Sequence, residues 1–159
     1  MDLLATLRRS GGVSAVAVQL DEAPAQVDQG VEALLPLLVS EMRAEVARLG
    51  GGDEGIAALV ALFDREGDGS LASRLLAERD VDPAVGYILL DRICREPGSS
   101  ERLAGKVTDT ELDKPMLARL AALLMMLVGG YMSARSAGTG AAGSGGPREL
   151  GELYEDLLR

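Results

Sequence analysis

Residues 116–132 read MLARLAALLMMLVGGYM. From Leu120 to Met132 this stretch holds thirteen residues without a charge, and Arg119 and Arg135 flank it closely. A helix that crosses a membrane needs about 20 apolar residues in a row. The run is too short for that, so we expect a buried helix in the core of a soluble protein. No secretory signal is recognisable near Asp2, and the expected location is therefore cytoplasmic, without membrane association.

The rest of the chain also favours helices. The 159 residues are 47% hydrophobic, which suits one domain of ordinary size with a buried core. Alanine, leucine, glutamate and arginine dominate, and no stretch shows the sustained alternation of β-branched residues that is typical of strands. The predicted fold class is all-α, as a multihelical single domain.

Apolar spacing and helix-breaking residues indicate where the helices begin and end. A long helix capped by Asp21 is expected to continue to Gly50, with Pro36 kinking or breaking it. Thr108 to Glu111 fits a capping box for a single turn or for the next helix. The other expected helices cover 2–9, 13–20, 56–63, 71–78, 82–95, 101–107, 116–132 and 148–159.

The helical domain, residues 1–135, contains a weak internal repeat of a short, a short and a long helix. The two units cover 1–49 and 87–135, and residues 50–86 form a helical insert between them. A shift of 86 positions sets four apolar residues of the first unit on four leucines of the second, namely Val31, Leu34, Leu37 and Leu38 on Leu117, Leu120, Leu123 and Leu124. The alternative is a chance alignment of leucine-rich helices.

The last residues have a separate character. Residues 136–147 (SAGTGAAGSGGP) are predicted to be a flexible linker, and 148–159 an amphipathic helix. The apolar face of this helix is the predicted partner-binding surface, made of Leu150, Leu153, Tyr154, Leu157 and Leu158. The spacing leaves open whether the helix packs on its own body or on another molecule.

Charge and composition exclude several classes of function. The formal net charge is −9, which repels a phosphate backbone and an anionic membrane surface. The chain has no histidine and one cysteine, Cys94, so histidine-based catalytic triads and cysteine-rich metal sites are excluded. No catalytic residue and no cofactor-binding motif is found. We expect a non-enzymatic protein that binds a protein partner or forms a homo-oligomer.

One loop resembles a calcium site. Asp64, Glu66 and Asp68 occupy positions 1, 3 and 5 of an EF-hand-like loop, and Gly69 occupies position 6. Position 12, where a bidentate glutamate is required, holds Leu75. A weak calcium-responsive module is therefore an alternative function, and a helix–helix turn rich in aspartate and glycine is the simpler interpretation.

Nucleic-acid binding is a further alternative. Two helices joined at Leu20-Asp21 imitate a helix-turn-helix. The second helix offers Gln26, Gln29 and Glu32 but no lysine or arginine before Arg43, whereas base edges are read mainly by basic and amide side chains. This pattern and the charge of −9 disfavour a nucleic-acid partner.

Two segments carry a resemblance to a known family. Residues 15–42 read AVAVQLDEAPAQVDQGVEALLPLLVSEM, with Leu20-Asp21 at a turn followed by an LPLL stretch, and residues 88–94 read ILLDRIC. Together with Leu120 to Gly130, these segments resemble the YidB-like family of uncharacterised bacterial proteins over about two-thirds of the chain. The resemblance implies an all-helical fold and no established activity or catalytic residues. Ala122 and Glu96-Pro97 depart from the family pattern.

Overall fold

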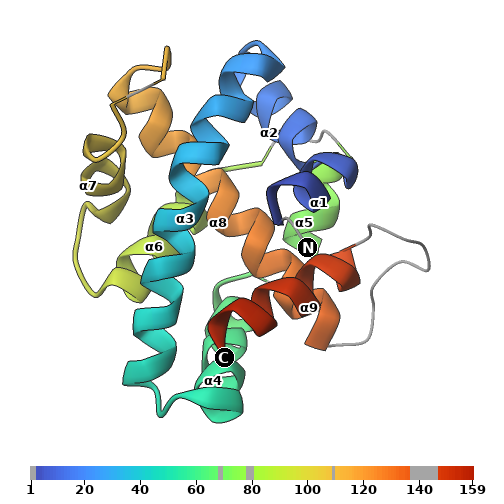
Figure 1. The fold of residues 1–159 in the computed structure, drawn as a ribbon, viewed down its shortest axis with the longest axis vertical. Helices are drawn as coiled ribbons and strands as arrows, with labels where there is room; N and C mark the ends of the chain where they lie inside the picture. The colour runs from blue at the N-terminus through green and yellow to red at the C-terminus, as the bar shows by residue number, and fades with distance from the viewer. Residues whose placement is uncertain (1–2, 68–69, 78–80, 109, 137–146) are drawn as a thin grey trace.

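The apolar stretch at 116–132 lies at the centre of the protein. In the computed structural model, it belongs to α8 (Lys114–Ser136), around which the other helices are arranged (Figure 1). Every residue from Leu120 to Met132 is buried, so the prediction of a core helix is confirmed. By length and composition α8 is apolar enough to cross a membrane, but 89% of its most apolar window is buried inside the protein.

The structure describes residues 3–67, 70–77, 81–108, 110–136 and 147–159. These ranges contain nine helices and no β-strand, so the chain has an all-α, multihelical fold. Besides α8 the helices are α1 (Leu3–Arg9), α2 (Gly12–Leu20), α3 (Pro24–Arg48), α4 (Gly52–Glu66), α5 (Ser70–Leu76), α6 (Ala84–Cys94), α7 (Ser99–Gly105) and α9 (Pro147–Leu158).

The start of α3 differs from the prediction. Asp21 does not cap α3. It ends α2 instead, with a left-handed backbone (φ 53°) whose N–H donates to Ala17 O and Val18 O. A residue in this conformation lacks the extended backbone of an N-cap, and Ala23 takes that position without a side-chain hydrogen bond. The helix then runs unbroken through Pro36, so the expected break is absent.

Aspartates accept backbone hydrogen bonds at the starts of two of the later helices. Asp82 Oδ1 accepts from Ala84 N at 2.9 Å, but the N-cap position of α6, expected at Asp82, is taken by Pro83. At the start of α8, Asp113 Oδ1 accepts from Met116 N at 3.0 Å. The predicted capping box at 108–111 is therefore wrong for α8, and Asp109 lies outside the described residues.

A glycine brings α6 directly against the central helix. A Cβ atom on Gly86 would collide with the backbone carbonyl of Ala122 in α8. Only a residue without a side chain permits this approach of two helix backbones. The position of α6 on α8 therefore depends on Gly86.

The order of the elements repeats a short, a short and a long helix. α1, α2 and α3 have this order, and so do α6, α7 and α8, while α4 and α5 occupy the insert between them. The second predicted unit begins at 87, whereas α6 already begins at Ala84, so the bounds of the units at 1–49 and 87–135 stay a prediction. A common origin of the two units stays a prediction.

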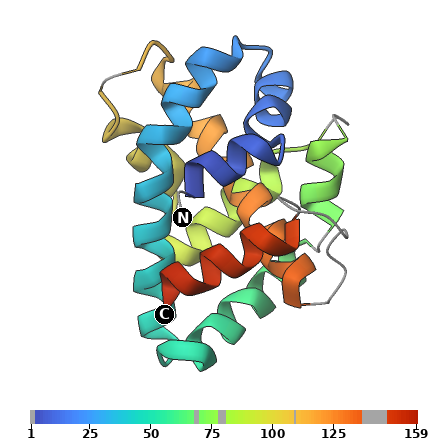
Figure 2. The same cartoon turned by 45° about the vertical axis from the view of Figure 1, so that its right-hand side comes forward.

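The C-terminal helix lies on the chain's own body. α9 packs most extensively on α8 and also contacts α3, α1 and α4. Figure 2 shows α9 running between α1 and α4. The predicted linker falls almost entirely on residues 137–146, which lie outside the described residues.

Candidate functional site

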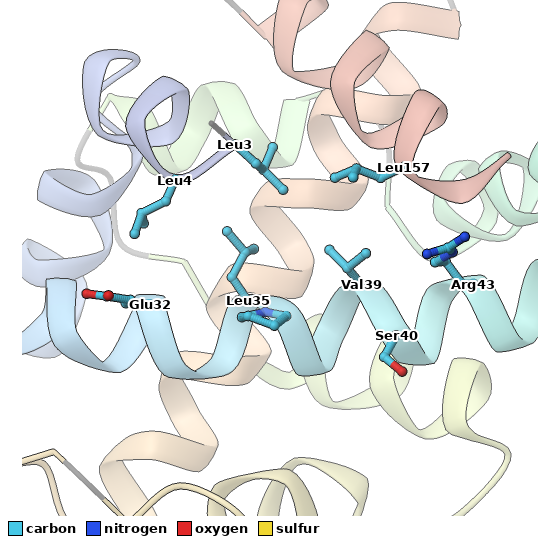
Figure 3. A pocket seen from close by; sticks show the side chains of 9 residues that line it. Leu3, Leu4, Glu32, Leu35, Val39, Ser40, Arg43 and Leu157 are labelled. Carbon is cyan, nitrogen blue, oxygen red and sulfur yellow. The ribbon is translucent and has the colours of Figure 1, made fainter. Parts of the chain in front are cut away.

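An apolar groove of about 650 Å³ lies between α1, α3 and α9. Figure 3 shows that side chains from all three helices face it. Its lining residues are Leu3, Leu4, Glu32, Leu35, Pro36, Val39, Ser40, Arg43 and Leu157. Five of the nine are leucine or valine, so the groove presents mainly aliphatic surface.

One face of α3 forms the floor. Val39 lies four positions after Leu35 and three after Pro36, which places it beside both of them on one side of the helix. Leu35 is 5% exposed and packs into the core, whereas Val39 is half-buried and Pro36 is exposed. Because proline has no N–H, the carbonyl of Glu32 lacks its usual helical donor four residues later.

The walls come from the two ends of the chain. Leu3 and Leu4 of α1 are half-buried, and Leu157 of α9 is 40% exposed. Arg8 anchors α1 to α3, because its Nε and Nη2 donate to the two carboxylate oxygens of Asp28, each at 2.6 Å. The wall formed by α1 is thus tied to the floor.

Charged side chains of opposite sign mark the two ends of the floor. Glu32 and Arg43 are eleven positions apart on α3, which corresponds to about 16 Å along the helix axis. Both are exposed, and no ion pair involves either of them within the residues that the structure describes. The groove is therefore apolar along its length, acidic at one end and basic at the other.

The five residues predicted to bind a partner divide into two groups. Leu150 and Tyr154 are fully buried against the chain's own body and Leu158 is 4% exposed, so no partner reaches them while α9 is docked. Leu153 is half-buried. Leu157 is exposed and contributes to the groove.

The predicted calcium loop is only partly described. Asp64 is exposed, and Glu66 Oε1 forms an ion pair with Arg92 Nε at 2.7 Å. Asp68 lies outside the described residues. Within the described ranges, no group of three or more carboxylate, cysteine or histidine side chains could hold a metal ion. Glu66 therefore has a structural partner in Arg92.

Cys94 has the surroundings of an unreactive thiol. It is half-buried, and burial raises its pKa to about 11, with a further increase from the neighbouring Glu41 carboxylate. Thiolate is the nucleophilic form, so a raised pKa suppresses nucleophilic chemistry near neutral pH.

Sequence reasoning did not find the groove. In the sequence, Leu35 and Val39 belong to an apolar stripe along the long helix expected from Asp21 to Gly50, and Leu157 belongs to the amphipathic helix expected at 148–159. Which helices would meet above that stripe depends on contacts between the two ends of the chain, and helical periodicity carries no signal for them.

The fold and the groove together define an all-α protein with an apolar groove on one face. Comparison with protein families, with curated proteins and with solved structures finds no match for this chain. The resemblance to the YidB-like family therefore stays a prediction.

Proposed function

We propose that the chain is a non-enzymatic interaction module that binds an amphipathic helix of a partner protein in the groove between α1, α3 and α9. The observation that carries the proposal is an apolar groove with opposite charges at its ends. Helix-in-groove recognition uses apolar anchors spaced three and four residues apart on one face of the bound helix.

The length of the groove suits such a ligand. The distance of about 16 Å between the levels of Glu32 and Arg43 corresponds to about three turns of helix. A helix of this length presents about four apolar anchors on one face. Leu3, Val39 and Leu157 offer aliphatic surface for them.

The charges also select a direction. A helix carries about half a positive charge at its N-terminus and half a negative charge at its C-terminus. The N-terminus of the partner is therefore expected beside Glu32 and its C-terminus beside Arg43. The bound helix would run parallel to α3.

Binding is tested by fluorescence anisotropy with a labelled peptide of about twelve residues. It carries leucines at i, i+3, i+4 and i+7, a lysine in its first turn and a glutamate in its last. We expect saturable binding to the full chain. Val39→Asp should weaken it on the order of tenfold or more, because the peptide would bury an unpaired carboxylate.

Val18→Asp is the matched control. Val18 lies on α2, is 51% exposed and does not line the groove, so this change should leave peptide affinity within about twofold. Equal loss of affinity in both variants would contradict the proposal. So would binding of laurate without binding of the peptide, because the groove would then accept an acyl chain anchored at Arg43.

The predicted homo-oligomer is the other protein partner for this surface. If the chain self-associates, Val39→Asp should abolish the dimer in sedimentation experiments, and the groove would then belong to an interface between copies. That outcome would overturn binding of a foreign helix. The net charge of −9 supports a protein partner over a nucleic acid or a membrane, and the cytoplasmic location stays a prediction.

A further inference from the structure

A second cleft, of about 760 Å³, lies between α3, α4 and α6 and shares no lining residue with the groove. Arg65 of α4 and Arg92 and Arg95 at the end of α6 line it. Arg48 lies beside them, because it shares the carboxylate of Glu45 with Arg95. We call this region the arginine cleft.

The cleft is a positive island on an acidic protein. Its four arginines face two carboxylates, Glu45 and Glu66, which leaves two positive charges in excess. The whole chain carries −9. The cleft therefore has a net positive charge, whereas the rest of the molecule has a net negative charge.

A buried carboxylate holds two of these guanidinium groups in place. The side chain of Glu45 is only 6% exposed, and its Oε1 accepts from Arg48 Nε at 2.8 Å and from Arg95 Nε at 2.9 Å. Arg48 Nη2 also donates to Ile93 O at 2.8 Å, which ties α3 to the end of α6. Arg48 and Arg95 are thus held in place before any ligand enters.

The outer guanidinium groups keep free donors. The Arg92 and Arg95 side chains are 56% and 53% exposed, and each has five N–H donors of which few are used. Arg65 is exposed and forms no hydrogen bond or ion pair within the described residues. Arg95 also has a left-handed backbone (φ 55°), where glycine is the less strained residue, so an arginine at this position carries a conformational cost.

We propose that the arginine cleft binds a small organic phosphate monoester. Guanidinium groups match phosphate oxygens in geometry, and a phosphate monoester carries about −1.5 to −2 at neutral pH, which fits an excess of two positive charges. Apart from the arginines and Glu45, the lining residues of the cleft are all apolar, namely Leu49, Ala58, Ala61 and Leu62. The organic part of the ligand should therefore be small and apolar.

Isothermal titration of the full chain with butyl phosphate tests the proposal. We expect butyl phosphate to bind at least tenfold more tightly than hexanoate, which carries a single charge, and pentanol not to bind. Arg65→Gln should weaken butyl phosphate on the order of tenfold, because a charge-assisted hydrogen bond is lost. The melting temperature should stay unchanged, because Arg65 supports no observed contact.

Arg74→Gln is the matched control. Arg74 is an exposed arginine on α5 that does not line the cleft, so this variant loses the same charge elsewhere. It should retain affinity within about twofold. Equal effects of the two substitutions, equal binding of hexanoate, or no binding of butyl phosphate would overturn the proposal. Binding only to phosphatidylcholine vesicles that contain phosphatidic acid would also overturn it, in favour of a membrane ligand.

Discussion

Removing one oxygen atom should have opposite effects at two buried tyrosines. Tyr131 of α8 and Tyr154 of α9 are both fully buried. Tyr131 Oη lies 3.1 Å from Ser10 Oγ, whose own proton is donated to Leu7 O at 2.8 Å, so the tyrosine is the donor. Tyr154 Oη is buried without a hydrogen-bond partner among the described residues.

The magnitudes follow from these environments. A buried polar group without a partner costs about 1–3 kcal/mol. Removing the Tyr154 hydroxyl recovers this free energy, but part of the gain is lost because the packing contacts of the oxygen are lost too. Tyr154→Phe should therefore stabilise the fold by about 1 kcal/mol. Tyr131→Phe removes a hydrogen bond and should destabilise the fold by about 1 kcal/mol. For a chain of this size, 1 kcal/mol shifts the melting temperature by about 2–4 °C.

Urea unfolding followed by circular dichroism gives both free energies of unfolding, and differential scanning calorimetry gives both melting temperatures. The two variants are each other's control, because each loses the same atom from the same kind of side chain. A loss of stability in Tyr154→Phe equal to that in Tyr131→Phe would refute the reasoning. It would show that the Tyr154 hydroxyl is hydrogen-bonded in solution.

Three further predictions concern the docking of α9, the packing of α6 and the titration of Cys94. Leu150→Ala should lower the free energy of urea unfolding by about 2–5 kcal/mol, and Leu157→Ala by less than about 1 kcal/mol, because only Leu150 is fully buried; equal losses would contradict the docking of α9. Gly86→Ala should destabilise the fold by about 1–3 kcal/mol despite the better helix propensity of alanine, because its Cβ meets a backbone. Gly105→Ala, where a Cβ meets nothing, is the control and should be neutral or stabilising by up to about 1 kcal/mol. If thermal melts showed equal falls in melting temperature for Gly86→Ala and Gly105→Ala, the packing of α6 on α8 would be contradicted. The pKa of the Cys94 thiol rises from 9.0 to about 11 on folding, so its contribution to stability is complete below pH 9 and is lost as the pH rises towards 11. Cys94→Ala should therefore flatten the fall in urea midpoint that begins near pH 9. An identical pH profile in the unsubstituted chain and in Cys94→Ala would rule out a contribution of the thiol to this fall.

Local signals in the sequence predicted much of the fold. Apolar spacing and the glycines at 50–52 located α3 and its end, and the uncharged run located the central helix. The prediction failed at Asp21, because one residue cannot both end α2 in a left-handed conformation and cap α3 in an extended one. The break that was one of two expectations at Pro36 is absent, because the loss of a single hydrogen bond did not outweigh burial of the apolar residues around it.

The candidate sites were less predictable, because each joins helices that are distant in sequence. The apolar face of 148–159 was recognised, but the sequence did not indicate that this face packs on α8. The contact between α8 and α9 decides which side chains of α9 remain accessible. The arginine cleft had no sequence signal either. Arg65 and Arg92 are 27 positions apart, and only the packing of α4 and α6 brings them to one cleft.

Binding of a helix in the groove between α1, α3 and α9 is tested most directly by nuclear magnetic resonance. The isotope-labelled chain is titrated with the leucine-patterned peptide carrying a nitroxide at its N-terminus. If the helix binds parallel to α3, amide shifts will concentrate around Leu3, Val39 and Leu157, and broadening will be stronger near Glu32 than near Arg43. Shifts confined to other surfaces, or none at all, would contradict the proposed docking site. Stronger broadening near Arg43 would contradict its direction.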